Sequence, residues 1–473
     1  MQWLFMLALC GFVTAFQASA SPHPIDEFIA SEIPADGGPG LAYAVLQDGE
    51  IYSGARGETL MGSGNAITPE TQFVLGSISK SFTAVAVMQL VEAGDINLDA
   101  PISQYLSAFS DSPGRLITIR QLLGQTSGYS TLQGNDTLAA MASTADGLTR
   151  QVERIAGWTP AHPPGSRWDY SNANYYVLGA LIEEVSGQDY ASYMEAEILA
   201  PVGMVDSFVT DGEIHLEVAR GHTPWFGGKR AVRPARTERM SAPAGGIIAT
   251  ARDTAQYLSV MMNGEDDIIS AASKSQMMSP ASDEVPFYGF GWYIDQANGT
   301  VSHTGLTPGV ETLAIMVPAE RRGVVILLNS GSGMGIGENT VLFNGISARA
   351  LGLDEASEDS GWGRKALFAS FALLPLVFGA GILVAWLRRD GLRAKSGLSG
   401  TFSLWFPLLM TLALAWSTLI LIPQLFGVSI GTLGRFSPDL ALVLAATAVT
   451  GLVWAIFRLA VFYIASSRSI KAD

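Results

Sequence analysis

Short apolar runs bounded by turn residues occur near both ends of the first 350 positions. The expected strands are 41–47, 51–55, 289–295, 309–317 and 323–329. The first two flank Asp48-Gly49, a dipeptide typical of tight β-hairpin turns. The last two flank a second polar turn. Paired runs of this kind predict hairpins, and together they predict a mixed antiparallel sheet.

Helical spacing of apolar residues fills the region between these strands. The expected helices are 80–93, 119–123, 149–156, 174–185, 191–198, 251–262 and, after the last strand, 338–351. Helices inserted between strands from the two ends of a region are typical of an α+β fold with a helical subdomain beside the sheet. We therefore expect one α+β domain over residues 21–353.

The N-terminal end begins with an apolar run over residues 3–16, followed by Ala18-Ser19-Ala20. This pattern predicts a secretory signal peptide over residues 1–20. Cys10, the only cysteine, lies within it. The mature chain is therefore expected to have no disulfide and no cysteine-based zinc site.

The C-terminal end contains three longer apolar runs, each long enough to span a bilayer. They are about 366–387, 402–426 and 440–464. The charged segment 354–365 is the expected linker, and 366–473 is the expected membrane domain.

Basic residues around these runs predict their orientation. They crowd the loop after the first run and follow the last run, whereas the loop between the second and third runs contains a single basic residue, Arg435. The positive-inside rule then predicts a multi-pass protein of the cytoplasmic membrane. Its α+β domain would lie on the periplasmic or extracellular side and its C-terminus in the cytoplasm.

Composition excludes several function classes. The net charge of −15, with 43 acidic and 28 basic residues, argues against nucleic acid as a partner. The sequence has no glycine-rich phosphate loop or dinucleotide fingerprint, and its five histidines lack metal-ligand spacing. We expect neither a metal nor a cofactor. The lipid bilayer is an expected partner, and the sequence leaves open whether the membrane helices also bind a protein.

Ser77-Ile78-Ser79-Lys80 is the strongest chemical signal in the chain. It precedes the expected helix 80–93, so Ser77 would lie at a helix N-terminus, where unpaired N–H groups favour negative charge. Residues three apart are neighbours on a helix, which would bring the Lys80 amine to the Ser77 hydroxyl. This pattern predicts a serine nucleophile activated by a base. The alternative is a helix cap followed by a solvated lysine.

Two later segments accompany this pattern, namely Tyr170-Ser171-Asn172 and His303-Thr304-Gly305. The order Ser-x-x-Lys, Tyr-x-Asn and then a basic residue before Thr-Gly resembles the serine β-lactamase and penicillin-binding-protein superfamily. The Tyr-x-Asn form is similar to the class C branch, which also holds D-Ala-D-Ala carboxypeptidases, D-aminopeptidases and esterases.

The resemblance extends over about residues 30–350. Segment 122–128 is similar to the family's Leu-Leu-x-His-Thr-Ser-Gly, with Gln125 in place of histidine, and segments 244–247 and 288–292 are similar as well. The resemblance implies a β-lactamase-like α+β fold, with the active site between the sheet and the helical subdomain.

The resemblance also implies catalytic roles. Ser77 would be the nucleophile that forms an acyl-enzyme, Lys80 would organise its proton, and Tyr170 would be the general base. A phenol has an ordinary pKa near 10, so Tyr170 would need the positive charge of Lys80 to act as a base at neutral pH. A core tyrosine at a helix start is the alternative for Tyr170.

The expected substrate-binding residues are Asn172, His303, Thr304, Gly305 and Leu306. Asn172 would hydrogen-bond Lys80 and the substrate amide, or else only cap a helix. By resemblance, the backbone N–H groups of Ser77 and Leu306 would form the oxyanion hole.

His303 departs from the β-lactamases, which usually have lysine at this place to bind the substrate carboxylate. Histidine has a pKa of about 6.5 and is mostly neutral at pH 7. This disfavours efficient β-lactam hydrolysis and is more similar to the peptidase and esterase members. We also expect one limb of the pH–rate profile to follow the titration of His303.

The sequence thus predicts a membrane-tethered serine hydrolase. It would act through a Ser77 acyl-enzyme on an amide or ester, and the resemblance implies D-amino-acid peptides or esters as the substrates. The alternative is a sensor that is acylated by a cell-wall peptide or β-lactam without turnover and signals through the membrane helices. A third hypothesis is an inactive scaffold, which the intact Ser77, Lys80 and Tyr170 disfavour.

Overall fold

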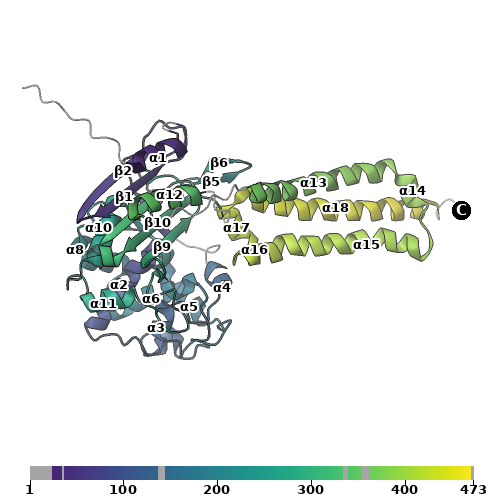
Figure 1. Ribbon diagram of the computed structural model, residues 1–473. Helices are drawn as coiled ribbons and strands as arrows, with labels where there is room; N and C mark the ends of the chain where they lie inside the picture. The colour runs from purple at the N-terminus through teal and green to yellow at the C-terminus, as the bar shows by residue number, and fades with distance from the viewer. Residues whose placement is uncertain (1–23, 35–36, 137–143, 334–338, 354–361, 470–473) are drawn as a thin grey trace, which may run out of the picture.

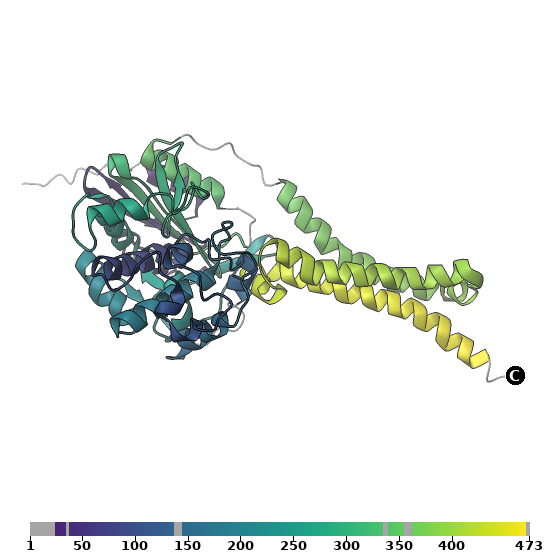
Figure 2. The same ribbon diagram turned by 90° about the horizontal axis from the view of Figure 1, so that it is seen from below.

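The computed structural model describes residues 24–34, 37–136, 144–333, 339–353 and 362–469. The expected signal peptide and most of the expected linker lie outside these ranges. A globular part is followed by three long helices that extend together to one side (Figures 1 and 2).

The centre of the globular part is a six-stranded antiparallel sheet in the order β2-β1-β11-β10-β9-β8. Its strands are β1 (Leu41–Gln47), β2 (Glu50–Arg56), β8 (Tyr293–Asp295), β9 (Thr300–Thr307), β10 (Val310–Val317) and β11 (Arg322–Leu328). At the β1–β2 turn, Asp48 and Gly49 have φ angles of 55° and 81°. Such left-handed values are what a two-residue hairpin turn requires. The antiparallel sheet expected from the two ends of the domain is therefore confirmed.

Helices cover both faces of this sheet, which explains why β1 is apolar at almost every position. Side chains of Tyr43 and Val45 pack in a cluster with α1 (Pro24–Glu32) and α12 (Thr340–Leu351). The intervening Ala42 and Ala44 face the other side, in the main core with α10 (Ala251–Met262). Successive side chains of a strand point to opposite faces, so each face receives its own set.

A helical region forms the other half of the globular part. Its elements are α2 (Ser79–Glu92), α3 (Ile119–Leu123), α4 (Thr131–Asp136), α5 (Gly147–Ala156), α6 (Asn172–Ser186), α7 (Tyr190–Met194), α8 (Ala200–Val202), α9 (Ala242–Gly245) and α11 (Ala271–Met277). Helix α2 is buried along nearly all of its length. Its apolar sequence therefore places it in the core, where it packs against α6, α7 and α9.

Two small sheets were not anticipated from the sequence. One has the order β3-β7-β4, with β3 (Phe73–Val74), β7 (Ile247–Ala249) and β4 (Phe208–Val209), and the other pairs β5 (His222–Trp225) with β6 (Gly228–Ala231). Strands of two to four residues carry too few positions to show a period. The expected strand 289–295 is also shortened to Tyr293–Asp295.

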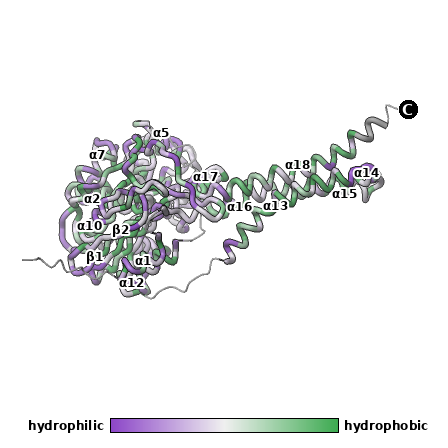
Figure 3. Tube along the Cα trace, turned by 90° about the horizontal axis from the view of Figure 1, so that it is seen from above, coloured by the Kyte–Doolittle hydropathy of each residue, from purple (hydrophilic) through white to green (hydrophobic). Residues whose placement is uncertain are grey.

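The C-terminal region contains three helices long and apolar enough to cross a membrane: Trp362–Leu387, Gly397–Leu425 and Pro438–Ile464. They correspond to α13 (Trp362–Leu387), α15 and α16 (Gly397–Trp416 and Ile422–Leu425, joined by a π-helical turn), and α18 (Pro438–Ser469). α18 lies between the other two (Figure 1). Their surfaces are hydrophobic, whereas α14 (Arg389–Arg393) at the far end is hydrophilic (Figure 3). The three expected apolar helices are confirmed, and the first begins at Trp362 rather than at 366.

Candidate active site

Ser77 lies in a 3-10 turn, Gly76–Ile78, that leads directly into α2. Lys80 is in the first turn of α2, and its Nζ donates to Ser77 Oγ at 3.0 Å. The expected contact between the Lys80 amine and the Ser77 hydroxyl is therefore present. The reason is local, because the helix starts between them and places the two side chains one turn apart.

Lys80 is fully buried, and its Nζ also donates to the carbonyl oxygen of Ala244 at 2.8 Å. Burial lowers the pKa of Lys80 well below its ordinary value. Among the described residues, no carboxylate pairs with it. Lys80 therefore loses its proton more readily than an exposed lysine, which favours a role as a base.

Close backbone packing brings strand β9 against the nucleophile turn. Gly76 has φ 58°, and a Cβ at this position would lie 2.8 Å from the backbone N of Leu306. A Cβ on Gly305 would lie 2.0 Å from the carbonyl oxygen of Leu75, which accepts a hydrogen bond from Thr312 Oγ1 at 2.7 Å. Only glycine fits at both positions. The contact places the N–H of Leu306 beside the Ser77 turn, as an oxyanion hole requires.

Tyr170 lies next to this pair, with Lys80 Nζ 4.9 Å from the centre of its ring. Burial raises the pKa of Tyr170 well above its ordinary value, the neighbouring Tyr288 and Tyr293 add to the rise, and a hydrogen bond with Ser77 opposes it. The net shift is opposite to the lowering expected from Lys80. Desolvation disfavours the charged form of both groups, which are the lysine ammonium and the tyrosine phenolate.

His303 is buried on β9 within a group of aromatic rings. Its ring centre lies 5.2 Å from that of Tyr293 and 6.1 Å from that of Tyr170, and its Nδ1 is 2.6 Å from the carbonyl oxygen of Thr304. Burial, and secondly the nearby Lys80, lower the pKa of His303 to about 3. This low pKa disfavours the pH limb expected from His303, which stays a prediction for a pH–rate profile to test. Thr304 itself is exposed.

Asn172 begins α6 and donates from Nδ2 to Asn135 Oδ1 at 3.0 Å. Within the described part of the chain, the hydrogen bonds of Lys80 go to Ser77 and Ala244, so the expected Lys80–Asn172 bond is not found. Asn172 projects from the start of its helix toward the α4 side and not toward α2.

Gln125, which stands where the family has histidine, connects the 122–128 segment with the start of α6. It has φ 61°, and its Oε1 accepts from Ser171 N at 2.9 Å and from Asn174 Nδ2 at 2.6 Å. Asn174 Oδ1 in turn accepts from Ser127 Oγ at 2.5 Å. This buried network fixes the Tyr-x-Asn segment against the 122–128 segment. Sequence reasoning located both segments and missed the network, because its partners lie 46 and 49 residues apart.

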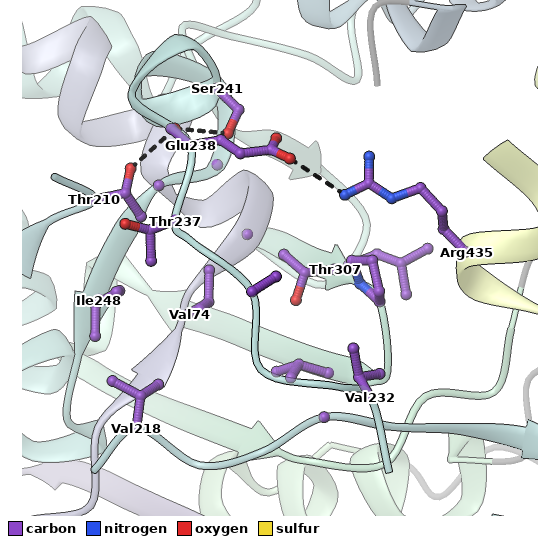
Figure 4. Close-up of a pocket in the computed structure, with 18 of the residues that line it drawn as sticks. Val74, Thr210, Val218, Val232, Thr237, Glu238, Ser241, Ile248, Thr307 and Arg435 are labelled. Carbon is purple, nitrogen blue, oxygen red and sulfur yellow. Dashed lines mark hydrogen bonds and ion pairs between the residues drawn. The ribbon is translucent and has the colours of Figure 1, made fainter. Parts of the chain in front are cut away.

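A cavity of about 300 Å³ opens beside the nucleophile. Its lining includes Ser77, Asn172 and Leu306 among the expected site residues, and it also includes Glu238 and Arg435 (Figure 4). Lys80 and Tyr170 are not among the residues that line this cavity. Over the residues the structure describes, no group of three or more His, Asp or Glu side chains is placed to hold a metal ion.

Comparisons with known proteins identify the family. Residues 25–342 match the family model described as Beta-lactamase, so the chain belongs to this family. It is 29% identical over 337 residues to penicillin-binding protein 4 of Amycolatopsis lactamdurans, covering 67% of this chain and 86% of that protein. The chain spans 64% of the length of the protein flp of Staphylococcus aureus, at 24% identity over 66% of this chain.

Solved structures show the same fold. The octameric penicillin-binding protein homologue from Pyrococcus abyssi is 27% identical with a TM-score of 0.56, covering 65% of this chain and 73% of that one. A class C β-lactamase has a TM-score of 0.57 at 20% identity, covering 71% and 96%. The resemblance inferred from the sequence is confirmed, and a hydrolase role is supported. The family model covers the globular part and ends before the three apolar helices.

Proposed function

We propose that the protein is a membrane-held serine hydrolase in which Ser77 forms an acyl-enzyme with an amide or ester substrate. The observation that carries the proposal is the 3.0 Å contact between Ser77 Oγ and a fully buried Lys80 amine. Because burial favours the neutral amine, Lys80 has a free electron pair for the Ser77 proton.

Acylation follows from these positions. Lys80 Nζ accepts the Ser77 proton as Oγ bonds to the substrate carbonyl carbon, and the carbonyl electron pair moves onto oxygen. The N–H groups of Ser77 and Leu306 stabilise this oxyanion. When the intermediate collapses, the bond to the leaving amine or alcohol breaks. Tyr170, which keeps its proton, donates it to the leaving group and takes one from Lys80.

Deacylation reverses the roles. A water molecule gives a proton to Lys80 as its oxygen bonds to the acyl carbon, and Ser77 Oγ leaves with a proton returned from the amine. This scheme gives the base role to Lys80 and the acid role to Tyr170, in place of the Tyr170 base expected by resemblance.

The substrate class is proposed from the relatives. D-amino-acid peptides or esters of the cell wall fit a relative named as a penicillin-binding protein. They also fit the location that the basic residues predict, which is the outer side of the cytoplasmic membrane. A neutral His303 offers no cation to a β-lactam carboxylate, so peptidase or esterase activity is favoured over efficient β-lactamase activity.

The test uses the full chain in nanodiscs, labelled with a fluorophosphonate probe and with penicillin and analysed by intact mass. Turnover of a p-nitrophenyl ester and of a D-Ala-D-Ala peptide is followed in parallel. We expect one adduct per chain, absent in Ser77→Ala, together with turnover. A stable adduct without turnover would support the sensor hypothesis instead, and the lack of any Ser77-dependent adduct would refute both.

A further inference from the structure

One wall of the cavity beside Ser77 comes from the membrane domain. Helix α17 (Ile430–Phe436) lies in the loop between the second and third long helices. Its residues Arg435 and Phe436 line the same cavity as Ser77 and Leu306. Figure 4 shows the Arg435 side chain reaching across from its helix toward Glu238. The substrate site is therefore incomplete without this loop.

Specific contacts hold the loop in this place. Asn135 Nδ2, whose Oδ1 accepts from Asn172, donates to the carbonyl oxygen of Gly427 at 3.0 Å. At the other end of the loop, the backbone N of Phe226 donates to Asp439 Oδ2 at 3.0 Å. One chain of hydrogen bonds thus connects the Tyr-x-Asn segment with the membrane domain.

The charged residues that line the cavity are mostly positive, whereas the whole protein has a negative net charge. The chain carries net −15, yet among the residues that the structure describes, the charged ones on the cavity wall are four arginines and one carboxylate, Glu238. The arginines are Arg220, Arg233, Arg236 and Arg435. This excess of positive charge in an acidic protein favours an anionic ligand.

Arg435 is the arginine best suited to such a ligand. Its Nη2 lies 3.4 Å from Glu238 Oε1, and 40% of its side chain is exposed against 19% for Glu238. The guanidinium of Arg435 thus lies partly exposed at the cavity wall, where an anionic ligand would compete with Glu238 for it. Because the pKa of His303 on β9 is low, this residue offers no positive charge to a substrate anion. Arg435 lines the same cavity as Ser77 and offers that charge.

We propose that Arg435 binds an anionic group of the substrate, a carboxylate or a phosphate, so that the membrane domain takes part in substrate recognition. The inference rests on the proposed acylation of Ser77. A guanidinium binds either anion in a bidentate manner. The mostly apolar remainder of the wall, which includes Val74, Val218, Val232, Ile248 and Val310, would contact the uncharged part of the substrate.

The test compares two acylating esters that differ only in charge, mono-p-nitrophenyl glutarate and its methyl ester. Full-length protein in phosphatidylcholine nanodiscs is mixed with each ester, and the acylation rate is followed by p-nitrophenol release and by the mass of the Ser77 adduct. We expect Arg435→Gln to slow acylation by the anionic ester about tenfold, the effect of losing a hydrogen bond to a charged group. The neutral ester should change less than about twofold, and Arg435→Lys should restore part of the loss.

Two further variants separate ligand binding from domain docking. Arg393→Gln is the matched control, because Arg393 is also an exposed arginine of the membrane domain and pairs with Asp390 at 3.1 Å, in α14 at the far end of the helices. It should leave both rates unchanged. Glu238→Gln removes the competing carboxylate and should speed the anionic ester. If the Arg435–Glu238 pair served only docking, Arg435→Gln and Glu238→Gln would slow both esters alike, and the proposal would be overturned.

The source of the anionic substrate is distinguished by repeating the comparison with long-chain analogues embedded in the nanodisc. A dependence on Arg435 in either format supports the proposal and shows whether the substrate is dissolved or held in the bilayer. Equal rates for wild type and Arg435→Gln in both formats overturn it. An adduct with no Arg435 effect refutes this inference alone, whereas the absence of any Ser77 adduct refutes the proposed function as well.

Discussion

Two lysines are buried in the part of the chain that the structure describes, Lys80 and Lys274, and they differ in their partners. Lys80 donates to Ser77 Oγ and to the carbonyl oxygen of Ala244 and has no carboxylate partner among the described residues. Lys274 lies 2.5 Å from Asp267 and also donates to Asn263 Oδ1 and the carbonyl oxygen of Glu265. We propose exchanging each lysine for methionine, which has a similar length and no charge.

The two substitutions should have opposite effects. Lys80→Met removes the base, so acylation should fall about 10² to 10⁴-fold, the usual contribution of a general base, which equals about 3 to 5 kcal/mol of activation free energy. Its stability should change little, because losing the bond to Ala244 costs about 1 to 3 kcal/mol while the unfavourable burial of an amine is relieved. Lys274→Met removes the ion pair with Asp267 and the hydrogen bonds to Asn263 and Glu265. This loss should lower the free energy of unfolding by about 1 to 3 kcal/mol and leave acylation unchanged.

The dependence of stability on pH provides an independent check. The unfolded lysine holds its proton up to about pH 10.5, whereas burial lowers the pKa of folded Lys80. Between the two pKa values the unfolded state binds more protons, so the stability of the wild type rises with pH in this window. Lys80→Met should remove this rise.

The assay is the rate of fluorophosphonate labelling of Ser77 in full-length protein, combined with chemical unfolding at several pH values. Lys80→Met labelling within a factor of about ten of wild type would refute Lys80 as the base. A drop in labelling for Lys274→Met equal to that of Lys80→Met would show that both act only through folding.

Three further outcomes are expected. His303→Gln should keep the shape of the acylation profile from about pH 5 to about pH 9, since the pKa of His303 is about 3; a limb near pH 6.5 that disappears in the variant would contradict this. Gly76→Ala should slow acylation about 10² to 10³-fold by displacing the Leu306 N–H. Gly299→Ala is the control, because Gly299 has a similar φ of 62° and a Cβ there would have no atom within 4 Å. It shares the backbone strain and should keep full activity. Gln125→Ala should lower the free energy of unfolding by about 2 to 3 kcal/mol in thermal or chemical unfolding, because Ser171 N loses its acceptor; a change below about 0.5 kcal/mol would argue against the buried network.

Much of the fold was visible in the sequence because its signals are local. The hairpin at Asp48-Gly49, helix 119–123, helix 251–262 and the three apolar helices agree with the structure to within a few residues. In each case a turn dipeptide, a capping residue or a long apolar run acts on its own neighbours. Short strands such as β3 and β4 left no period to detect, and they form only because β7 lies between them.

The sequence by itself determined the family, the Ser77–Lys80 pair and the three long apolar helices, because each depends on residues close together along the chain. The tertiary structure alone decided the electrostatics. Desolvation in the folded protein lowers the pKa values of Lys80 and His303 and raises that of Tyr170, so each shift disfavours the charged form of its group. The tertiary structure also brought Arg435 to the cavity across 358 residues from Ser77 (435 minus 77). A group's pKa depends on how far the surrounding residues exclude water from it. The lining of a cavity depends on which segments, distant along the chain, come together in the fold. No local sequence pattern contains either kind of information.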